Sequence, residues 1–135
     1  MTMNSEKTKN ILFVCVENSC RSQMAEAFAK ASCKGRIAAY SAGSRSSGMV
    51  NPDAVKVMAE AGYDLSGHVS KSLTDIPDIE YDIAVTMGCG DECPFVKAKK
   101  RVDWNMPDPK GNTIEFFRAV RNLIEAKVKE LLSDL

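Results

Sequence analysis

Residues 10–22 read NILFVCVENSCRS and contain the first two elements of the expected fold. Asn10–Val16 is a short apolar run, which is typical of a strand that is buried on both faces. A helical pattern begins at Ser22 and continues to about Cys33, with apolar residues three and four positions apart. The stretch therefore predicts a strand, a tight loop and a helix in direct succession.

The rest of the chain continues this alternation of strands and helices. Further strands are expected at 36–41, 81–87 and 100–104. One helix should begin at Asn51 and Pro52, an N-cap followed by proline at the first helical position. The last helix should have Asn112 as its N-cap and Glu115 at its third position. Alternating strands and helices imply right-handed crossovers and a parallel sheet. We predict one doubly wound α/β domain over residues 1–135, a four-stranded parallel sheet with helices on both faces and a loose tail at 1–8.

Composition excludes several classes of protein. A chain of 135 residues is the size of one domain. Eighteen Lys and Arg balance 18 Asp and Glu, so no net charge attracts nucleic acid or an anionic membrane. The apolar run at 11–16 is shorter than the core of a signal peptide or a membrane span. We expect a cytoplasmic protein with reduced cysteines and no nucleic-acid or membrane partner.

The loop after the first strand carries the chemistry. It consists of Cys15, Val16, Glu17, Asn18, Ser19, Cys20, Arg21 and Ser22. Backbone N–H groups in such a loop can surround a tetrahedral anion, and the following helix adds its positive N-terminus. Arg21 can bind two anion oxygens at once, and Asn18 tolerates the left-handed conformation that a tight curl requires. The same positive field favours the nucleophilic thiolate of Cys15, and the Ser22 hydroxyl can hydrogen-bond its sulfur.

This pattern predicts a cysteine nucleophile in an oxyanion-binding loop. The simpler alternative is that Cys15 is a small buried strand residue and Arg21 a surface charge. Asp108 lies between two prolines on a stiff loop after the fourth strand. In a parallel sheet this loop can reach the first one, so Asp108 is the candidate general acid. Its alternative role is an ordinary turn residue.

Two further cysteines, Cys89 and Cys93, are separated by three residues. On a helical turn they would be close enough to form a disulfide if the turn deformed. Zinc would need more ligands than the single histidine, His68, and this pair supply, so we predict no metal. Two inert buried thiols are the other alternative, and a redox pair is favoured. Cys20 and Cys33 are interpreted as packing residues.

Taken together, these motifs resemble a known family. CVENSCRS, the stretch GYDLSGHVSKSL at 62–73, the late cysteine pair and the Asp-Pro loop resemble the thioredoxin-coupled arsenate reductases of the low-molecular-weight protein tyrosine phosphatase superfamily. The resemblance implies that arsenate binds in the loop, with phosphate or sulfate as analogues. It also implies that Cys15 attacks arsenic while Asp108 protonates the departing hydroxide. Cys89 then attacks Cys15, arsenite leaves, and Cys93 moves the disulfide to Cys89–Cys93, which thioredoxin reduces. We expect a monomer.

The sequence departs from the family in two ways. The family places about six residues between the late cysteines, and a shorter spacing restricts the swing from Cys15 to Cys93. Some members bind potassium through an Asn, a Glu, a Ser and an Asp. Asn18, Glu26 and Ser41 match the first three, whereas Lys71 stands in place of the Asp. We therefore predict that the protein needs no potassium.

Two other functions remain open at the level of the sequence. A phosphatase of the same fold would act on phosphate monoesters, but its acidic Asp-Pro is usually followed by tyrosines, and here Lys110 and Gly111 follow. It would also have no use for Cys89 and Cys93. A non-enzymatic anion-binding or redox-sensing module is the second alternative.

Overall fold

The computed structural model describes residues 8–33, 36–88 and 96–135, and its centre is a four-stranded sheet. The strands are β1 (Lys9–Cys15), β2 (Ile37–Gly43), β3 (Tyr81–Thr86) and β4 (Ala98–Asp103). They lie in the order β2-β1-β3-β4, and every neighbouring pair is parallel. The predicted four-stranded parallel sheet is confirmed. Because the chain goes from β1 to β2 and then returns past β1 to β3, the strand order reverses at the carboxyl end of β1. Ligands bind at such switch points, and the Cys15 loop begins there.

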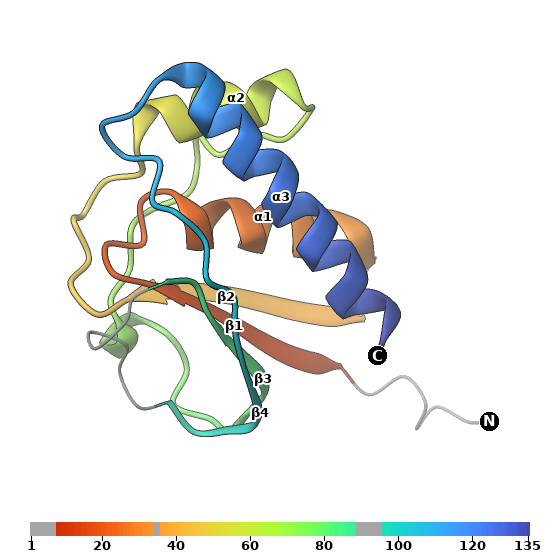
Figure 1. The fold of residues 1–135 in the computed structure, drawn as a ribbon. Helices are drawn as coiled ribbons and strands as arrows, with labels where there is room; N and C mark the ends of the chain where they lie inside the picture. Colours follow the sequence, from red (N-terminus) through yellow and green to blue (C-terminus); the bar gives the residue numbers. More distant parts are fainter. Residues whose placement is uncertain (1–7, 34–35, 89–95) are drawn as a thin grey trace.

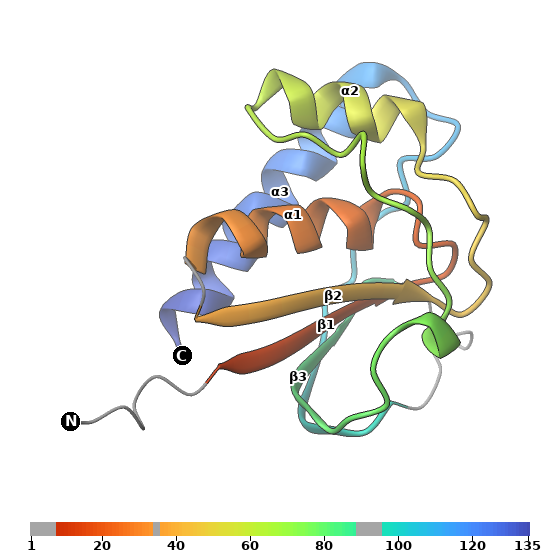
Figure 2. The ribbon, with the colours of Figure 1, turned by 180° about the vertical axis from the view of Figure 1, so that it is seen from behind.

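Three α-helices formed by the described residues cover one face of the sheet (Figures 1 and 2). They are α1 (Arg21–Cys33), α2 (Pro52–Glu60) and α3 (Ile114–Ser133). Ile11 and Phe13 of β1 belong to the same buried cluster as Met24 of α1 and Phe117 of α3. Alternate residues of a strand point to opposite faces, so this half of β1 faces the helices.

The other half of β1, Leu12 and Val14, faces a second and smaller core. The segment between α2 and β3 covers it, with the 3-10 helix η2 (Leu73–Asp75) and the partly buried Ile76 and Ile79. Both faces of β1 are thus buried, which explains its unbroken apolar run. The covering of the two faces differs, because the described residues place all their α-helices on one side and only the 3-10 helix on the other. Turn formers interrupt the 62–80 segment, so it cannot sustain an α-helix.

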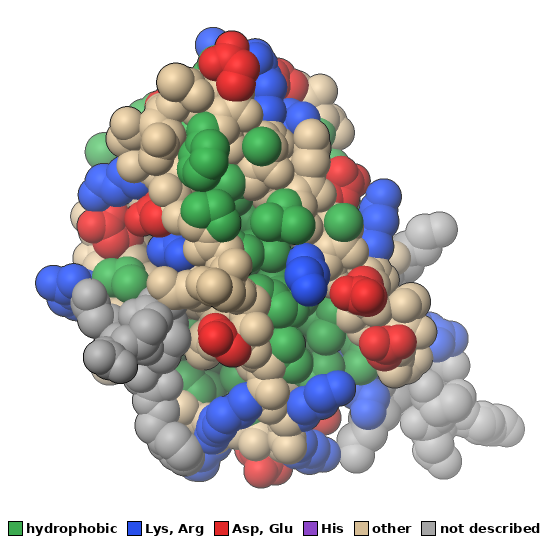
Figure 3. All heavy atoms as spheres, viewed as in Figure 1, with side chains coloured by type: hydrophobic (Ala, Val, Ile, Leu, Met, Phe, Trp, Pro, Cys, Tyr) green, Lys and Arg blue, Asp and Glu red, His purple; other side chains and the backbone are tan. Residues whose placement is uncertain are grey.

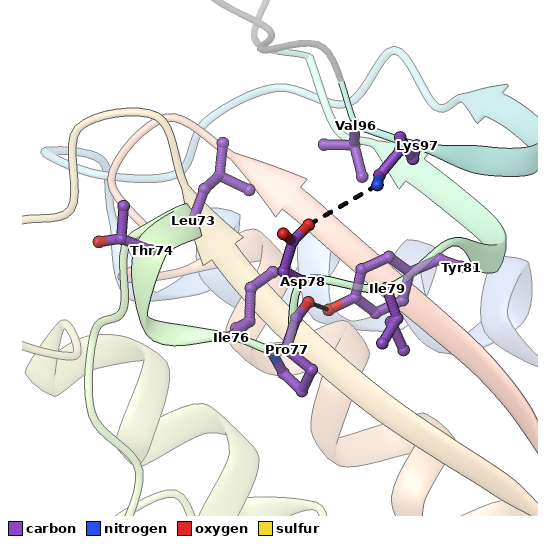
Figure 4. A pocket seen from close by; sticks show the side chains of 9 residues that line it. All are labelled: Leu73, Thr74, Ile76, Pro77, Asp78, Ile79, Tyr81, Val96 and Lys97. Atoms are coloured by element: carbon purple, nitrogen blue, oxygen red, sulfur yellow. Dashed lines mark hydrogen bonds and ion pairs between the residues drawn. The ribbon is translucent and has the colours of Figure 1, made fainter.

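A cavity of about 580 Å³ opens on this second face (Figure 4). Its lining is mainly apolar and comprises Leu73, Thr74, Ile76, Pro77, Asp78, Ile79, Tyr81, Val96 and Lys97. The Tyr81 hydroxyl donates a hydrogen bond to the Pro77 carbonyl, and burial raises the pKa of Tyr81 to about 12. The lining contains no residue of the 15–22 loop, so this cavity is separate from the predicted oxyanion site.

Helix capping agrees with the sequence at α2 and differs at α3. The Asn51 side chain accepts a hydrogen bond from the Asp53 N–H at 2.8 Å, as an N-cap should. At α3 the N-cap is Thr113, whose hydroxyl accepts from the Phe116 N–H at 3.2 Å. The prediction of Asn112 was wrong by one residue, because the Asn112 N–H bonds the Pro109 carbonyl and Asn112 belongs to the preceding turn.

The open edge of the sheet is strongly basic. Strand β4 is one of the two edge strands of the sheet, and it exposes Lys99, Lys100 and Arg101 in succession. Charged side chains at an edge discourage pairing with another chain. Figure 3 shows the molecule from the same side as Figure 1, with hydrophobic side chains gathered along the middle and charged ones on either side. In the part of the chain that the structure describes, no helix combines the length and apolarity needed to cross a membrane.

Candidate active site

The backbone of the 15–22 loop is held from outside by the segment that follows β2. The carbonyls of Cys15, Val16 and Glu17 accept hydrogen bonds from the N–H groups of Ser44, Arg45 and Ser47 at 3.3, 2.8 and 3.1 Å. The C=O and N–H of a trans peptide point in opposite directions, so the N–H groups of these peptides face the interior of the loop. That arrangement suits a tetrahedral anion.

Gly43 at the end of β2 allows this close approach. A Cβ atom at Gly43 would lie 2.5 Å from the Val16 carbonyl oxygen and 2.9 Å from the Asn18 nitrogen. Any other residue would push the loop away from the sheet. Sequence reasoning did not single out Gly43, since the contact joins two segments that are far apart in the chain.

Asn18 adopts the left-handed conformation that the sequence predicted, with φ of 53°. Its side chain is fully buried and used at both ends. Nδ2 donates to Ser22 Oγ at 2.7 Å, while Oδ1 accepts from Gln23 Nε2 at 2.8 Å and from the Lys71 N–H at 2.7 Å. Asn18 therefore fixes the curl of the loop through its own backbone and through three neighbours.

Cys15 lies at the end of β1 and is 2% exposed. Its sulfur is 2.8 Å from Ser22 Oγ. That hydroxyl accepts from Asn18 Nδ2, and its own hydrogen is available to donate to the sulfur of a thiolate. A hydrogen bond of this polarity stabilises the thiolate. The predicted contact between Ser22 and the Cys15 sulfur is confirmed.

Gln23 extends this network away from the sulfur and was missed in the sequence. Its Nε2 donates to Asn18, and its Oε1 lies 3.0 Å from His68 Nδ1. Since an amide oxygen only accepts, the His68 ring must donate there. Burial lowers the pKa of His68, which favours the neutral ring. No signal in the sequence marks this role, because the full burial of Gln23 depends on how α1 packs.

Arg21 is 5% exposed and is held above the loop by its Nη1 atom. Nη1 donates to the carbonyls of Met87, just after β3, and Met106, after β4. Among the described residues, Nε is buried without any hydrogen-bond partner. Nε therefore has a free donor, and together with Nη2, which lies 3.7 Å from Asp108 Oδ2, it forms an edge that can bind two oxygens of an anion. Assigning Arg21 to the surface is wrong.

Gly88 makes room for this arginine. It has φ of +80°, and a Cβ there would lie 2.7 Å from both Arg21 Nη1 and the Met106 carbonyl oxygen. The glycine is required by its conformation and by the space that the guanidinium occupies.

Asp108 approaches the loop from the far end of the chain, as the sequence predicted. Its Oδ2 is 3.7 Å from Arg21 Nη2, and its Oδ1 accepts from the Lys110 N–H at 3.0 Å. The carboxyl group is half exposed, so it can exchange protons with solvent. The loop at 105–111 carries Asp108 and is called the acid loop, after the candidate role of Asp108. It is anchored by Trp104, which is buried against Phe13 with ring centroids 5.9 Å apart.

The other cysteines have different positions. Cys20 is buried in the loop, and burial raises its pKa to about 12, so its thiol stays neutral and is a poor nucleophile. Cys89 and Cys93 lie outside the described residues, between Gly88 and Val96.

Lys71 lies among the side chains that match the family's potassium ligands. Its Nζ is 3.5 Å from both Glu26 Oε1 and Ser41 Oγ and 3.3 Å from the Val69 carbonyl oxygen. Burial alone would raise the pKa of Glu26, but contacts with Lys30, Ser41 and Lys71 outweigh it and lower that pKa. Among the residues placed in the structure, no cluster of three His, Cys, Asp or Glu side chains could hold a metal.

Comparisons with known proteins agree with this geometry. Residues 10–135 match the model of the low molecular weight phosphotyrosine protein phosphatase family. The chain belongs to this family. One relative, "Glutaredoxin arsenate reductase" of Synechocystis, is 40% identical to this chain over 130 residues. The match covers 94% of this chain and 98% of the relative.

Two solved structures extend the comparison of this phosphatase-family fold. "An arsenate reductase in the phosphate binding state" is 40% identical with a TM-score of 0.85, and the match covers 94% of this chain and 98% of that one. The thioredoxin-dependent arsenate reductase of Corynebacterium glutamicum is 27% identical with a TM-score of 0.77, over 95% of this chain and 62% of that one.

Proposed function

We propose that this member of the low molecular weight phosphatase family reduces arsenate to arsenite, with Cys15 as the nucleophile. The observation that carries the proposal is the convergence of Cys15 and the Nε–Nη2 edge of Arg21 on one oxyanion loop. Similarity over nearly the whole chain to arsenate reductases supports arsenate as the substrate.

The first step uses only residues that the structure describes. Arsenate binds to the loop N–H groups and to the Nε–Nη2 edge of Arg21. The Cys15 thiolate forms a bond to arsenic, and a hydroxide leaves as water after Asp108 protonates it. Arg21 neutralises the charge that develops on the oxygens, and Ser22 and Asn18 hold the sulfur in line.

The second stage uses the late cysteines in the order that the family resemblance implies. Cys89 attacks the sulfur of Cys15, a disulfide forms, and the electron pair of the sulfur–arsenic bond reduces arsenic(V) to arsenic(III) as arsenite leaves. Cys93 then attacks Cys89, which frees the Cys15 thiolate and leaves a Cys89–Cys93 disulfide. Two thiols are oxidised for each arsenate reduced.

The proposal includes a cytoplasmic monomer that thioredoxin returns to the reduced state. A cytoplasmic setting keeps the thiols reduced between turnovers. The similarity to a thioredoxin-dependent enzyme supports thioredoxin, whereas the relative from Synechocystis carries glutaredoxin in its name. Steady-state arsenite formation with each donor in turn distinguishes them, and turnover with glutaredoxin and glutathione alone contradicts the thioredoxin assignment.

We also propose that the Lys71 ammonium supplies the positive charge that potassium provides elsewhere in the family. Its contacts with Glu26 and Ser41 support this, because a second cation in the same place would be repelled. Exchanging sodium for potassium at fixed ionic strength should leave the rate unchanged. A severalfold rise in activity would contradict the proposal.

A single-turnover experiment tests the reductase. Fully reduced protein is mixed with excess arsenate without external thiol, arsenite is assayed, and remaining thiols are alkylated and mapped by mass spectrometry. We expect about one arsenite per chain and a Cys89–Cys93 disulfide, because each turnover oxidises two thiols. The matched control is Cys15→Ser, which should bind phosphate but produce no arsenite.

Other outcomes have defined meanings. No arsenite with every thiol intact would reject the reductase and favour hydrolysis of phosphate monoesters at the same loop. A disulfide that stops at Cys15–Cys89 would keep the reductase but reject Cys93 as the resolving residue.

A further inference from the structure

One feature of the site has no part in the proposed chemistry: an ion pair between Glu17 and Lys110. Lys110 Nζ lies 2.8 and 3.0 Å from the two carboxylate oxygens of Glu17. Glu17 belongs to the oxyanion loop, and Lys110 follows the acid by two positions. The side chains are 36% and 53% exposed, compared with 6% for Arg21. The pair thus joins the two loops on the solvent side of the site.

Lys110 also holds the general acid in place. Its backbone N–H donates to Asp108 Oδ1 at 3.0 Å, which leaves Oδ2 on the side of Arg21. The side chain therefore fixes the acid loop to the oxyanion loop, and the backbone fixes the carboxyl group within the acid loop.

The charges of the pair matter for an anionic ligand. An unpaired carboxylate at Glu17 would repel an oxyanion bound to the same loop. The hydrogen bond with Glu17 raises the pKa of Lys110, so the lysine is a cation at neutral pH and cancels that charge.

We propose that the Glu17–Lys110 pair selects inorganic oxyanions over phosphate or arsenate compounds that carry an organic group. An anion in the loop is bounded by Cys15, by Arg21 with Asp108, and on the solvent side by this pair. A free oxyanion carries no substituent that must pass beyond these groups. The organic group of a bound ester must point out of the loop toward solvent, and the Glu17 and Lys110 side chains lie there and join the two loops. The inference deepens the proposed function by specifying its substrate class.

The test uses Lys110→Met, Glu17→Gln and the double variant. Dissociation constants are measured by calorimetry for inorganic phosphate and for phenylphosphonate, which carries a phenyl group on the same tetrahedral anion. Lys110→Met should weaken phosphate binding by up to about fivefold, the upper end for an exposed ion pair. The double variant removes both charges and should bind phosphate within about twofold of wild type.

The double variant should also shift the ratio of the two dissociation constants toward phenylphosphonate by about threefold or more, because the solvent side is open. Arg118→Met is the matched control. It breaks an ion pair between α3 and α2, in which Arg118 Nε and Nη2 lie 2.9 and 2.8 Å from the two carboxylate oxygens of Glu60. This substitution should change neither dissociation constant.

Two results would overturn the proposal: an unchanged ratio in the double variant, or strictly additive effects of the two single substitutions on phosphate binding. Neither ligand requires Cys89 or Cys93. The outcome is therefore independent of the single-turnover experiment, and failure of arsenate reduction would be recognised separately. Unfolding midpoints confirm that all variants are folded.

Discussion

Asn18 contributes to the oxyanion loop through its backbone conformation and through its side chain. The sequence predicted the first contribution, since asparagine tolerates positive φ, and the structure adds the second. The side-chain contacts with Gln23 and Lys71 could not be predicted, because they depend on how α1 and the 62–73 segment pack.

Substitutions at Asn18 can separate the two contributions. Asn18→Gly removes the side-chain hydrogen bonds, but glycine adopts the left-handed conformation without strain. Asn18→Ala removes the same hydrogen bonds and also strains the backbone at this position. We expect the alanine variant to be less stable than the glycine variant by about 1 kcal/mol. Urea unfolding of both proteins checks this. Equal stabilities would mean that the backbone conformation is unstrained.

Gly88 determines where Arg21 can lie. Gly88→Ala places a methyl group 2.7 Å from Nη1 and should weaken phosphate binding about tenfold or more, the loss expected when a charge-assisted hydrogen bond is displaced. Gly62→Ala is the control, since Gly62 has φ of +93° with no described atom within 4 Å of the added methyl. Backbone strain should cost both variants about 1 kcal/mol of stability. Gly88→Ala should lose more, because its methyl group also meets the Met106 carbonyl oxygen at 2.7 Å, and only Gly88→Ala should affect phosphate. An unchanged dissociation constant in Gly88→Ala contradicts this account of Arg21.

The helices and strands were largely predictable because their periodicities are local. β1, β2 and β3 begin and end within two residues of expectation, and the acid loop reaches the oxyanion loop as parallel topology requires. The Glu17–Lys110 pair and the close approach of Gly43 were not predictable. They join residues that only the completed sheet brings together, and no pattern within one segment marks them.

The beginning of α3 was misplaced by one residue, and this can be tested. Thr113→Ala should destabilise the protein by about 1 kcal/mol, since it removes the acceptor of the Phe116 N–H. Asn112→Ala should change stability by less than about 0.5 kcal/mol. Chemical denaturation of the two variants measures both effects. If Asn112→Ala were the less stable of the two, Asn112 and not Thr113 would be the N-cap.

The molecule as a whole should lose stability in acid in two steps. The folded pKa of His68 lies below its usual 6.5, so the unfolded chain binds a proton first and stability falls as the pH drops below about 6.5. The folded pKa of Glu26 is also lowered, so its contribution is present above about 4.5 and is lost below that value.

Two substitutions assign these steps to residues. His68→Asn should flatten the upper step and leave the lower one. Glu26→Gln should leave the upper step and reduce the lower one without abolishing it, because the pKa values of Glu60, Asp64, Asp75 and Asp82 are also lowered. Unfolding free energies measured at several pH values between 7 and 3, about one unit apart, give the comparison. If the loss of stability below about pH 6.5 persists in His68→Asn, another group is responsible for it.

Arg21 is held by carbonyl groups 66 and 85 residues further along the chain, and Lys110 lies 93 residues beyond its partner. On the ribosome, Cys15, the proposed nucleophile, is therefore made long before the groups that complete its surroundings. The 15–22 loop emerges early, and at that stage Cys15 is an ordinary thiol in a chain that has no oxyanion site. The ability to bind arsenate appears only when the segment after β4 has been translated and the last strand has joined the sheet. A nascent or truncated chain that ends before residue 104 should thus be unable to commit its thiol to the reaction.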